Sequence, residues 1–344
     1  MFIGVAAVAS LVGLLRLRAA GAPSAVVVVT SASSGIGRAT GLGFAERGAR
    51  VVQAARRGDA LEELARRCRA AGGQALAVPT DVTDEAAVAE LAHRAVERFG
   101  RIDIWVNNAG TYLLGSLEAT PPEAFGQVLE TNFFGYVHGG RAVLPRFREQ
   151  GQGVLINNAS AYSPLRRTWL TAYVSSKFAV RGLSEALRQE LGDLPDLHVC
   201  PGVPVPDRHP DLRQHSQLQR PGGQGAAPTY PPEQVARAIL ASALHPNRER
   251  IVGGAGRLAT VAELVAPRLF ERANRRYVDE LQFAAEPAHA TDGNLPVCAQ
   301  LRPPRPDPGR LAAPTRPANR GPPGGRGRTA NRRRTRRRPD RHPL

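Results

Sequence analysis

Two side chains four residues apart, Tyr173 and Lys177, have the chemistry to move a proton together. They lie in the segment TAYVSSKFAV, and Lys177 is the only lysine among the 46 basic residues of the chain. Residues four apart on a helix share one face, and a nearby ammonium favours the ionised form of a phenol, whose ordinary pKa is about 10. We therefore expect Lys177 to lower the pKa of Tyr173, so that this phenol exchanges a proton with a substrate near neutral pH. Arginine would replace the compact ammonium poorly, because a guanidinium is large and planar.

A glycine-containing turn, TSASSGIGR over residues 30–38, follows the apolar run AVVVVT and precedes a helical pattern. Glycines allow the backbone to approach a phosphate, and a helix N-terminus offers free N–H groups and the positive end of its dipole. The turn is therefore a candidate phosphate site, although a plain strand–helix turn has the same pattern. Its candidate ligands are Thr30, Ser31, Ser33, Ser34, Gly35, Ile36, Gly37 and Arg38.

The elements that would position these residues alternate between strand and helix. Apolar, β-branched runs predict strands over 25–30, 49–57, 75–83, 102–110, 153–160 and 197–202, with a further one over 248–254. Amphipathic patterns predict helices over 35–46, 60–72, 85–100, 121–150, 171–192, 232–244 and 258–283. This alternation requires crossover connections, which predicts a single α/β domain with a doubly wound parallel sheet. Ligands of such sheets bind beyond the carboxyl ends of the strands, where the candidate residues gather.

The glycine turn resembles the Thr-Gly-x-x-x-Gly-x-Gly fingerprint of the short-chain dehydrogenase/reductases, with Ser31 in place of the first glycine. Other motifs of that family follow in register over about residues 25–202. They are DVT at 81–83, NNAG at 107–110, Asn132 in LETNFFG, Ser160 thirteen residues before Tyr173, the Tyr-x-x-x-Lys pair itself, and Pro201-Gly202. The resemblance implies a Rossmann-type fold and hydride transfer between a nicotinamide and a carbonyl/alcohol pair.

The resemblance also implies a role for each matching side chain. Tyr173 would be the acid/base, Lys177 would tune it and contact the nicotinamide ribose, and Ser160 would hydrogen-bond the substrate oxygen. Asn132 would hold a water that links Lys177 to solvent. A strand-capping Ser160 and a structural Asn132 are the alternatives. The cofactor would further contact Asp81, Val82, Asn108, Ala109, Gly110, Pro201 and Gly202.

The end of the second predicted strand, AARR, bears on which dinucleotide binds. An acidic residue there would bind the ribose 2′-hydroxyl of NAD. Arg56 and Arg57 stand there instead, Arg38 follows the glycine turn, and arginines suit a 2′-phosphate through bidentate contacts. The sequence therefore favours NADP(H) over NAD(H), although incidental surface arginines are an alternative in so arginine-rich a chain.

The net charge of +16 is concentrated near the C-terminus. Residues 302–344 hold 14 arginines and 2 aspartates, which leaves 32 basic and 28 acidic groups, a net charge of +4, for residues 1–301. The Pro/Arg-rich tail, 284–344, is expected to be disordered. Residues 302–344 include no aromatic side chain to stack on bases, so nucleic acid is not the expected partner. Three dispersed cysteines, Cys68, Cys200 and Cys298, predict neither a metal site nor a disulfide framework.

Residues 1–22 form an apolar leader with 15 uncharged residues before Arg16. A spanning helix needs about 20 apolar residues, so a short membrane anchor through residues 1–15, an amphipathic leader and a misassigned start codon are the alternatives. Arg16 and Arg18 would keep an anchored domain on the cytoplasmic side. The expected protein is therefore cytoplasmic, or membrane-associated from that side, with its catalytic domain at 23–283. The resemblance implies a homo-oligomer that acts on a small carbonyl or alcohol.

Residues 203–232 lack periodicity where the resemblance implies an apolar substrate lid. One permitted back-translation from residue 206 to about residue 221, shifted by one nucleotide, reads PIDTPIFASTANYSGR, so a compensated frameshift across about 203–226 is one hypothesis. The irregular lid and Ser31 together keep an alternative function open, that of a catalytically impaired dinucleotide-binding protein.

Overall fold

The computed structural model describes residues 25–160, 169–203, 216–217, 221–223, 231–246, 250–251, 254–281 and 283–287. The apolar leader, most of the 203–232 segment, Cys298 and the arginine-rich end of the chain lie outside these residues. The predictions of a membrane anchor, a frameshift and a disordered tail beyond residue 287 therefore also fall outside the described chain.

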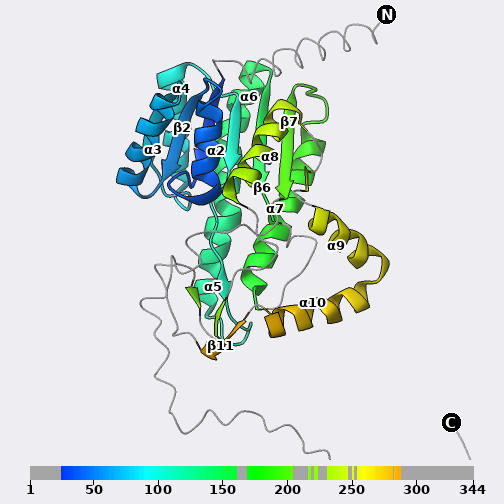
Figure 1. The fold of residues 1–344 in the computed structure, drawn as a ribbon. Helices are drawn as coiled ribbons and strands as arrows, with labels where there is room; N and C mark the ends of the chain where they lie inside the picture. The colour runs from blue at the N-terminus through cyan, green and yellow to red at the C-terminus, as the bar shows by residue number, and fades with distance from the viewer. Residues whose placement is uncertain are drawn as a thin grey trace, which may run out of the picture. The chain divides into compact units, whose positions relative to one another are not determined.

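A parallel sheet of seven strands forms the centre of the described chain (Figure 1). Its strands lie in the order β10-β7-β6-β4-β1-β2-β3. Their bounds are β1 (Val26–Thr30), β2 (Arg50–Ala55), β3 (Gln74–Pro79), β4 (Ile104–Asn107), β6 (Gly153–Asn158), β7 (Leu197–Val203) and β10 (Arg250–Ile251). The chain moves outward from β1 to β3 and then returns to the other side of β1 with β4. The strand order therefore reverses between β1 and β4, which is where sheets of this kind bind ligands.

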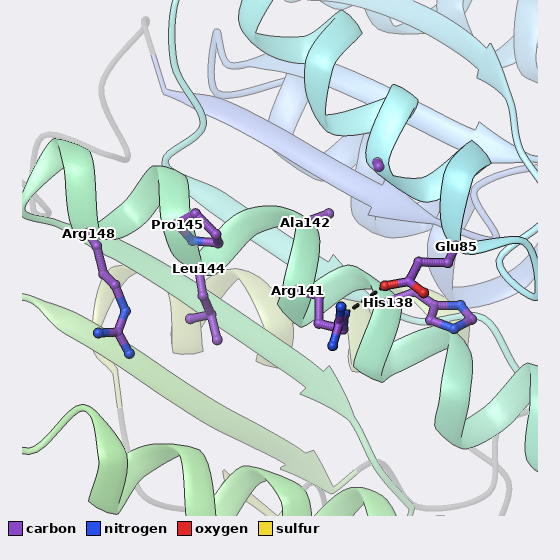
Figure 2. A pocket seen from close by; sticks show the side chains of 8 residues that line it. Glu85, His138, Arg141, Ala142, Leu144, Pro145 and Arg148 are labelled. Carbon is purple, nitrogen blue, oxygen red and sulfur yellow. Dashed lines mark hydrogen bonds and ion pairs between the residues drawn. The ribbon is translucent and has the colours of Figure 1, made fainter.

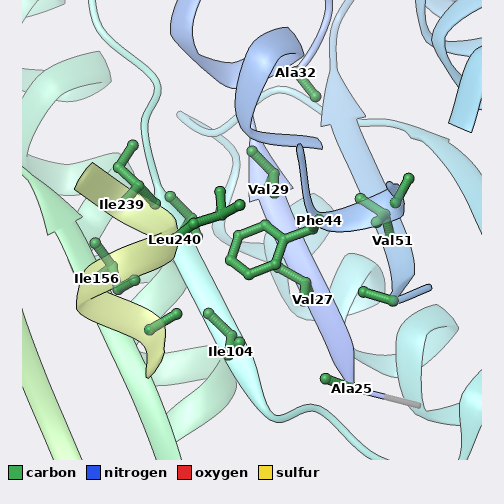
Figure 3. Close-up of a cluster of buried hydrophobic side chains, with 14 of the residues drawn as sticks. Ala25, Val27, Val29, Ala32, Phe44, Val51, Ile104, Ile156, Ile239 and Leu240 are labelled. Carbon is green, nitrogen blue, oxygen red and sulfur yellow. The ribbon is translucent and has the colours of Figure 1, made fainter. Parts of the chain in front are cut away.

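Helices cover both faces of the sheet, because side chains of alternate strand residues point to opposite faces. In β1, Val27 and Val29 lie in one hydrophobic core, and Val26 and Val28 lie in the other. Figure 3 shows the first core, where Phe44 packs over β1 and β4. The helices of that face are α2 (Gly35–Ala45), α3 (Gly58–Ala70) and α8 (Pro232–Leu244), and those of the other face are α4 (Glu85–Phe99), α6 (Gly135–Gln150) and α7 (Thr171–Glu190).

The fold class predicted from the sequence, a single α/β domain with a doubly wound parallel sheet, is confirmed. The further strand predicted over 248–254 is β10, which pairs in parallel with the end of β7. The helix predicted over 232–244 is α8, with the same bounds.

Two predicted helices are each divided. The helix predicted over 121–150 consists of α5 (Pro122–Leu129), a π-helical turn η2 (Glu130–Phe134) and α6. The single helix predicted over 258–283 is wrong, because α9 (Gly254–Val265) ends before Pro267 and α10 (Pro267–Leu281) begins there. A proline has no N–H to donate and its ring clashes with the preceding turn, so it favours the start of a new helix.

Two small sheets join segments that are distant in the sequence. β5 (Leu113–Leu114) pairs with β8 (Ser216–Gln217), and β9 (Pro221–Gly223) pairs with β11 (Phe283–Pro287). β8 and β9 lie in the segment predicted to be irregular. β11 lies at the start of the segment predicted to be a disordered tail. Such pairings depend on distant partners, which local periodicity does not reveal.

Candidate active site

Thr30, the last residue of β1, ties this strand to the loop after β4. Its Oγ1 accepts hydrogen bonds from the backbone N–H groups of Asn108 (2.9 Å) and Ala109 (3.2 Å). The same hydroxyl donates to the carbonyl oxygen of Val106 (3.3 Å), and the Asn108 side chain donates to the Thr30 carbonyl oxygen (3.2 Å). Three predicted cofactor-binding residues, Thr30, Asn108 and Ala109, therefore meet where the strand order reverses.

Asparagine side chains join the carboxyl ends of β4 and β6. Asn107 Nδ2 donates to Asn157 Oδ1 (2.9 Å), and Asn158 Nδ2 donates to Asn108 Oδ1 (2.8 Å). Asn157 Nδ2 in turn donates to Ser184 Oγ (2.9 Å) on α7, so that this helix is fixed to the sheet. Asn107, Asn157 and Asn158 were not predicted as site residues. The doubled asparagine after each of two apolar runs is the sequence signal that identifies them.

The turn after β1 has a left-handed backbone at Ser31, whose φ is +53°. L-residues avoid this region because the Cβ approaches the backbone, whereas glycine enters it freely. Gly37 lies against the same turn, since a Cβ at that position would collide with the Ser31 carbonyl oxygen. The sequence therefore has serine at a position where the backbone favours glycine.

Helix α2 begins at Gly35 and presents its N-terminus at this turn. Ser34 is the N-cap, and in the described chain its side chain makes no capping hydrogen bond and the first turn holds no acidic residue. Ser33 and Ile36 are partly buried beside it. The N–H donors and the positive dipole end of α2 therefore fit a phosphate group of a dinucleotide.

Exposed arginines lie around this turn. Arg38 is on the first turn of α2, and Arg56 and Arg57 follow the end of β2. Arg57 reaches the glycine turn, because its Nη2 donates to Ser33 Oγ (3.3 Å). Positive charge therefore reaches the candidate phosphate site at least through Arg57.

The turn after β3 is built by its predicted cofactor residues. Asp81 Oδ1 accepts hydrogen bonds from the backbone N–H (3.0 Å) and Oγ1 (2.8 Å) of Thr83. Val82 is buried, and a Cβ on Gly135 would come within 3.0 Å of it. The Asp81 carboxylate thus shapes the turn, and Val82 packs closely against the start of α6.

Lys177 is almost completely buried on α7, at 3% exposed. Its Nζ donates to the Asn158 carbonyl oxygen (3.0 Å) and to Tyr136 Oη (3.2 Å). The same nitrogen lies 5.8 Å from the centre of the Tyr173 ring, one helical turn away. Burial lowers the pKa of Lys177 to about 7, because an ammonium is poorly stabilised away from water. The structure therefore brings the predicted phenol–ammonium pair together.

The other predicted substrate-side residues line the same edge of the sheet. Tyr173 is partly buried, and its ring meets that of Tyr112 edge to face at 5.9 Å between centroids. Ser160 follows the end of β6 and is 5% exposed. Pro201 and Gly202 lie in β7 beside the end of β6, since the Gly202 carbonyl oxygen accepts from the N–H of Ala159 (2.8 Å).

Asn132 lies in the π-helical turn and is fully buried. Its Oδ1 accepts from the Thr111 N–H (2.7 Å), and its Nδ2 donates to the Thr111 carbonyl oxygen (2.7 Å) and to Ser176 Oγ (3.0 Å). Ser176 Oγ donates in turn to the Tyr173 carbonyl oxygen (2.7 Å). A Cβ on Gly110 would lie 3.7 Å from both Asn132 Oδ1 and Lys177 Nζ. Asn132 therefore connects the loop after β4 to the helix that carries Tyr173 and Lys177.

A surface pocket of about 420 Å³ lies between α4 and α6 (Figure 2). Glu85 of α4 forms an ion pair with Arg141 of α6 across it (2.6 Å). His138 and Arg148 also line it. The predicted site residues do not appear in its lining, so the candidate active site is defined by the strand ends and α7 rather than by this pocket.

The described residues contain no group of three or more His, Cys, Asp or Glu side chains arranged to hold a metal ion. Cys68 and Cys200 are buried thiols that form no disulfide with each other. Burial raises the pKa of the Cys68 thiol to about 11, which keeps it in its unreactive, protonated form. In the same part of the chain, every helix is too short or too polar to cross a bilayer.

Comparison with known proteins agrees with this arrangement. A family model described as short chain dehydrogenase matches residues 25–207, which include the strands from β1 to β7. An uncharacterised oxidoreductase of Bacillus subtilis, YxnA, is 35% identical over 272 residues, which are 77% of this chain and 75% of that protein. The bovine dehydrogenase/reductase SDR family member 7B is 32% identical over 75% of this chain and 82% of its own length.

Two solved structures have the same fold. A short-chain dehydrogenase/reductase from Burkholderia phymatum in complex with NAD has a TM-score of 0.63, with 24% identity over 72% of this chain and 95% of its own. An alcohol dehydrogenase from Thermococcus sibiricus with 5-hydroxy-NADP has a TM-score of 0.56, with 25% identity over 66% of this chain and 95% of its own. Since the family model spans six of the seven strands of the sheet and α7, and relatives match three quarters of the chain, this protein belongs to the short-chain dehydrogenase/reductase family of oxidoreductases.

Proposed function

We propose that this protein interconverts a small carbonyl compound and its alcohol with NADP(H), through Tyr173, Lys177, Ser160 and Asn132. Membership of the family makes it an oxidoreductase that acts on CH–OH groups with a nicotinamide dinucleotide. The observation that carries the finer proposal is the buried Lys177 ammonium, whose Nζ lies 5.8 Å from the centre of the Tyr173 ring.

In the direction of reduction, a nicotinamide bound at this site would supply the hydride for the carbonyl carbon. The Tyr173 hydroxyl donates its proton to the carbonyl oxygen, which gives the alcohol and leaves a phenolate at Tyr173. The Ser160 hydroxyl donates a hydrogen bond to the same oxygen while negative charge develops on it. Solvent then returns the proton to Tyr173. Oxidation of the alcohol follows these steps in reverse.

Lys177 stabilises the phenolate through its positive charge. Because the pKa of Lys177 is lowered to about 7, its ammonium and amine forms are both populated near neutral pH. Ionisation of Tyr173 favours the ammonium, and the ammonium favours ionisation of Tyr173, so the two groups titrate as a coupled pair. The hydrogen bond from Nζ to the Asn158 carbonyl oxygen keeps the lysine at the strand end during this exchange.

Asn132 keeps its proposed place in the proton relay, and it also has a structural task. Its two amide hydrogens are donated to the Thr111 carbonyl oxygen and Ser176 Oγ, so a water would be held through Oδ1 or the neighbouring backbone. The π-helical turn supports this role, since such turns leave backbone groups outside the regular helical pattern and recur at functional sites.

The preference for NADP(H) is proposed from charge. Arg38, on the first turn of α2, and Arg56, after β2, are exposed, and they would pair with the ribose 2′-phosphate of the bound dinucleotide. Arg57 is directed to the glycine turn through Ser33. A 2′-hydroxyl would leave these arginines without an anionic partner, whereas a phosphate would pair with them.

The test compares Tyr173→Phe with the unchanged protein. NADPH and NADH binding is measured by fluorescence titration, and turnover by NADPH oxidation over a panel of aldehydes and ketones. We expect NADPH to bind more tightly than NADH, and Tyr173→Phe to keep NADPH affinity while losing at least 100-fold in turnover, the usual scale of a lost general acid. Full turnover by Tyr173→Phe would exclude Tyr173 as the acid/base. Tighter binding of NADH would exclude the NADP(H) preference.

A second function, dinucleotide binding without turnover, is supported by one observation, the left-handed backbone at Ser31. The strained turn would weaken cofactor affinity and leave a binding protein with impaired catalysis. NADPH binding without oxidation by any carbonyl in the panel would favour this function.

The remaining proposals concern the whole protein. We propose a catalytic domain at 23–283, a homo-oligomer, a small-molecule substrate and a cytoplasmic location. The family supports the catalytic domain, the homo-oligomer and the small-molecule substrate, because its members share this domain, often form oligomers and act on small molecules.

A further inference from the structure

Tyr136, at the start of α6, places a second phenol beside Lys177. It is 1% exposed, and its Oη accepts a hydrogen bond from Lys177 Nζ (3.2 Å). The same hydroxyl donates to the Asn158 carbonyl oxygen (2.9 Å), which also accepts from Lys177 Nζ (3.0 Å). Tyr136, Lys177 and Asn158 therefore form a closed triangle of hydrogen bonds inside the protein.

The Tyr136 ring also faces the ammonium. Nζ lies 4.8 Å from the centre of the Tyr136 ring and 5.8 Å from that of Tyr173. An ammonium within about 6 Å of a ring face is attracted by the ring's electrons, more strongly when water is excluded. The two aromatic rings thus lie around one positive charge, one from α6 and one from α7.

The two phenols differ in their ability to ionise. Burial raises the pKa of Tyr136 well above 10, and the neighbouring Tyr173 raises it further, since two phenolates would repel each other. The Tyr136 hydrogen is also donated to a carbonyl, which requires the neutral form. Tyr136 therefore stays neutral while Tyr173, which is only partly buried, exchanges a proton.

We propose that Tyr136 is a positioning residue that holds the Lys177 ammonium beside Tyr173 through its hydroxyl oxygen and its ring face. The effect of Tyr136 on catalysis rests on the proposed function of Tyr173. The positioning of Lys177 by Tyr136 does not depend on that function. Removal of the hydroxyl takes away one acceptor of a charge-assisted hydrogen bond, and burial then favours the uncharged amine more strongly. The phenolate of Tyr173 loses part of its stabilisation as a result.

Because Lys177 is the only lysine, its titration can be read without ambiguity. Protein grown with [ε-¹³C]lysine gives a single labelled resonance, which is followed from pH 5 to 11 in the unchanged protein and in Tyr136→Phe. We expect Lys177 to titrate near pH 7 in the unchanged protein, and about one pH unit lower in Tyr136→Phe, the scale of one lost hydrogen bond to a charged group.

Ser242→Ala is the matched control. It also removes one buried hydroxyl, which donates a hydrogen bond to the Ala238 carbonyl oxygen (3.0 Å) on α8, and it should leave the Lys177 titration unchanged. If Tyr136→Phe does not fold, the unchanged protein still decides the matter through nuclear Overhauser effects between the Lys177 ε-protons and the Tyr136 ring. Equal titration in Tyr136→Phe and the unchanged protein, or the absence of these Overhauser effects, would overturn the proposal.

Activity supplies an independent readout. In alcohol oxidation, the acidic limb of the kcat/KM profile should move upward by about one pH unit in Tyr136→Phe, because Tyr173 ionises less readily. Ser242→Ala should keep the profile of the unchanged protein. The NMR titration needs neither cofactor nor substrate, so an inactive protein that still shows the Lys177 shift would contradict the proposed function and leave this inference intact.

Discussion

Ser31 and Lys177 are each held in a state that their residue type disfavours. Ser31 has a left-handed backbone, and Lys177 carries its amine in a site almost closed to water. Such states persist only when the surrounding structure determines them, and they cluster at functional sites. Ser31 is fixed by the packing of Gly37 against its carbonyl oxygen, and Lys177 is fixed by the Asn158 carbonyl and the Tyr136 hydroxyl.

At the residue scale, Ser31→Gly should stabilise the protein and tighten NADPH binding. Removal of the Cβ relieves a penalty of about 1–2 kcal/mol, which the greater flexibility of glycine in the unfolded chain partly offsets. We expect the free energy of unfolding to rise by about 0.5–1 kcal/mol in urea titrations.

Ser34→Gly is the control for this change. It removes the same side chain three residues later, where φ is −155° and the backbone is extended. It should give no stabilisation. A loss of stability in Ser31→Gly would show that the serine side chain has a favourable role in the turn.

The π-helical turn shows at the scale of elements how one side chain joins three segments. Asn132 lies within it and bonds to Thr111 after β4 and to Ser176 on α7. A buried amide with three such bonds is difficult to replace, because its partners would be left unsatisfied. The turn therefore couples the position of α7 to the loop that carries predicted cofactor residues.

Asn132→Ala should lower the free energy of unfolding by about 2–3 kcal/mol, since it leaves the Thr111 peptide groups and Ser176 without these partners. Thr131→Ala removes a single hydrogen bond in the same turn, from Thr131 Oγ1 to the Gln127 carbonyl oxygen (3.1 Å), and should lower it by about 1 kcal/mol or less. Urea denaturation measures both. Unchanged stability in Asn132→Ala would mean that Asn132 serves the proton relay without the structural task.

The strands and helices of the sheet were predictable because each has a local signature. The apolar run of β1 and the amphipathic pattern of α3 are complete within their own segments. The break at Pro267 was also present in the sequence, but the amphipathic pattern continues across it. β5, β8, β9 and β11 were not predictable, since each depends on a partner distant in the sequence.

The candidate site was predictable to a similar extent. Spacing alone paired Tyr173 with Lys177, and the glycine turn identified the start of α2. The contact between Tyr136 and Lys177 was not predictable, because it depends on how α6 and α7 pack over β6. The only sequence sign of the left-handed backbone at Ser31 is that the family fingerprint has a glycine at this position.

At the scale of the whole molecule, a buried lysine links stability to pH. Since the pKa of Lys177 is about 7 in the folded protein and 10.5 in its ordinary state, the unfolded chain binds more protons between these values. The contribution of Lys177 to the free energy of unfolding therefore rises with pH across this range. Below about pH 7 both states carry the proton, so the penalty for burying the charge is fully present.

Lys177→Met removes this dependence. We expect the free energy of unfolding of the unchanged protein, minus that of Lys177→Met, to increase by several kcal/mol between pH 7 and 10. Urea titrations at each pH measure this difference. Ionisable groups that do not interact with Lys177 are common to both proteins and cancel in the difference, whereas the coupled Tyr173 contributes to it. A difference that stays constant over this range would show that Lys177 titrates at its ordinary value when folded.

Because Lys177 is buried, acylation of its amine can report local opening of the folded protein. An acylating reagent meets no ε-amine on the folded surface, because the one such amine, on α7, is 3% exposed and lies against Tyr136 of α6 and the end of β6. Residue 177 becomes acylated only in molecules in which the site around its amine has opened. The rate of acylation at this residue therefore measures how often this site opens under native conditions.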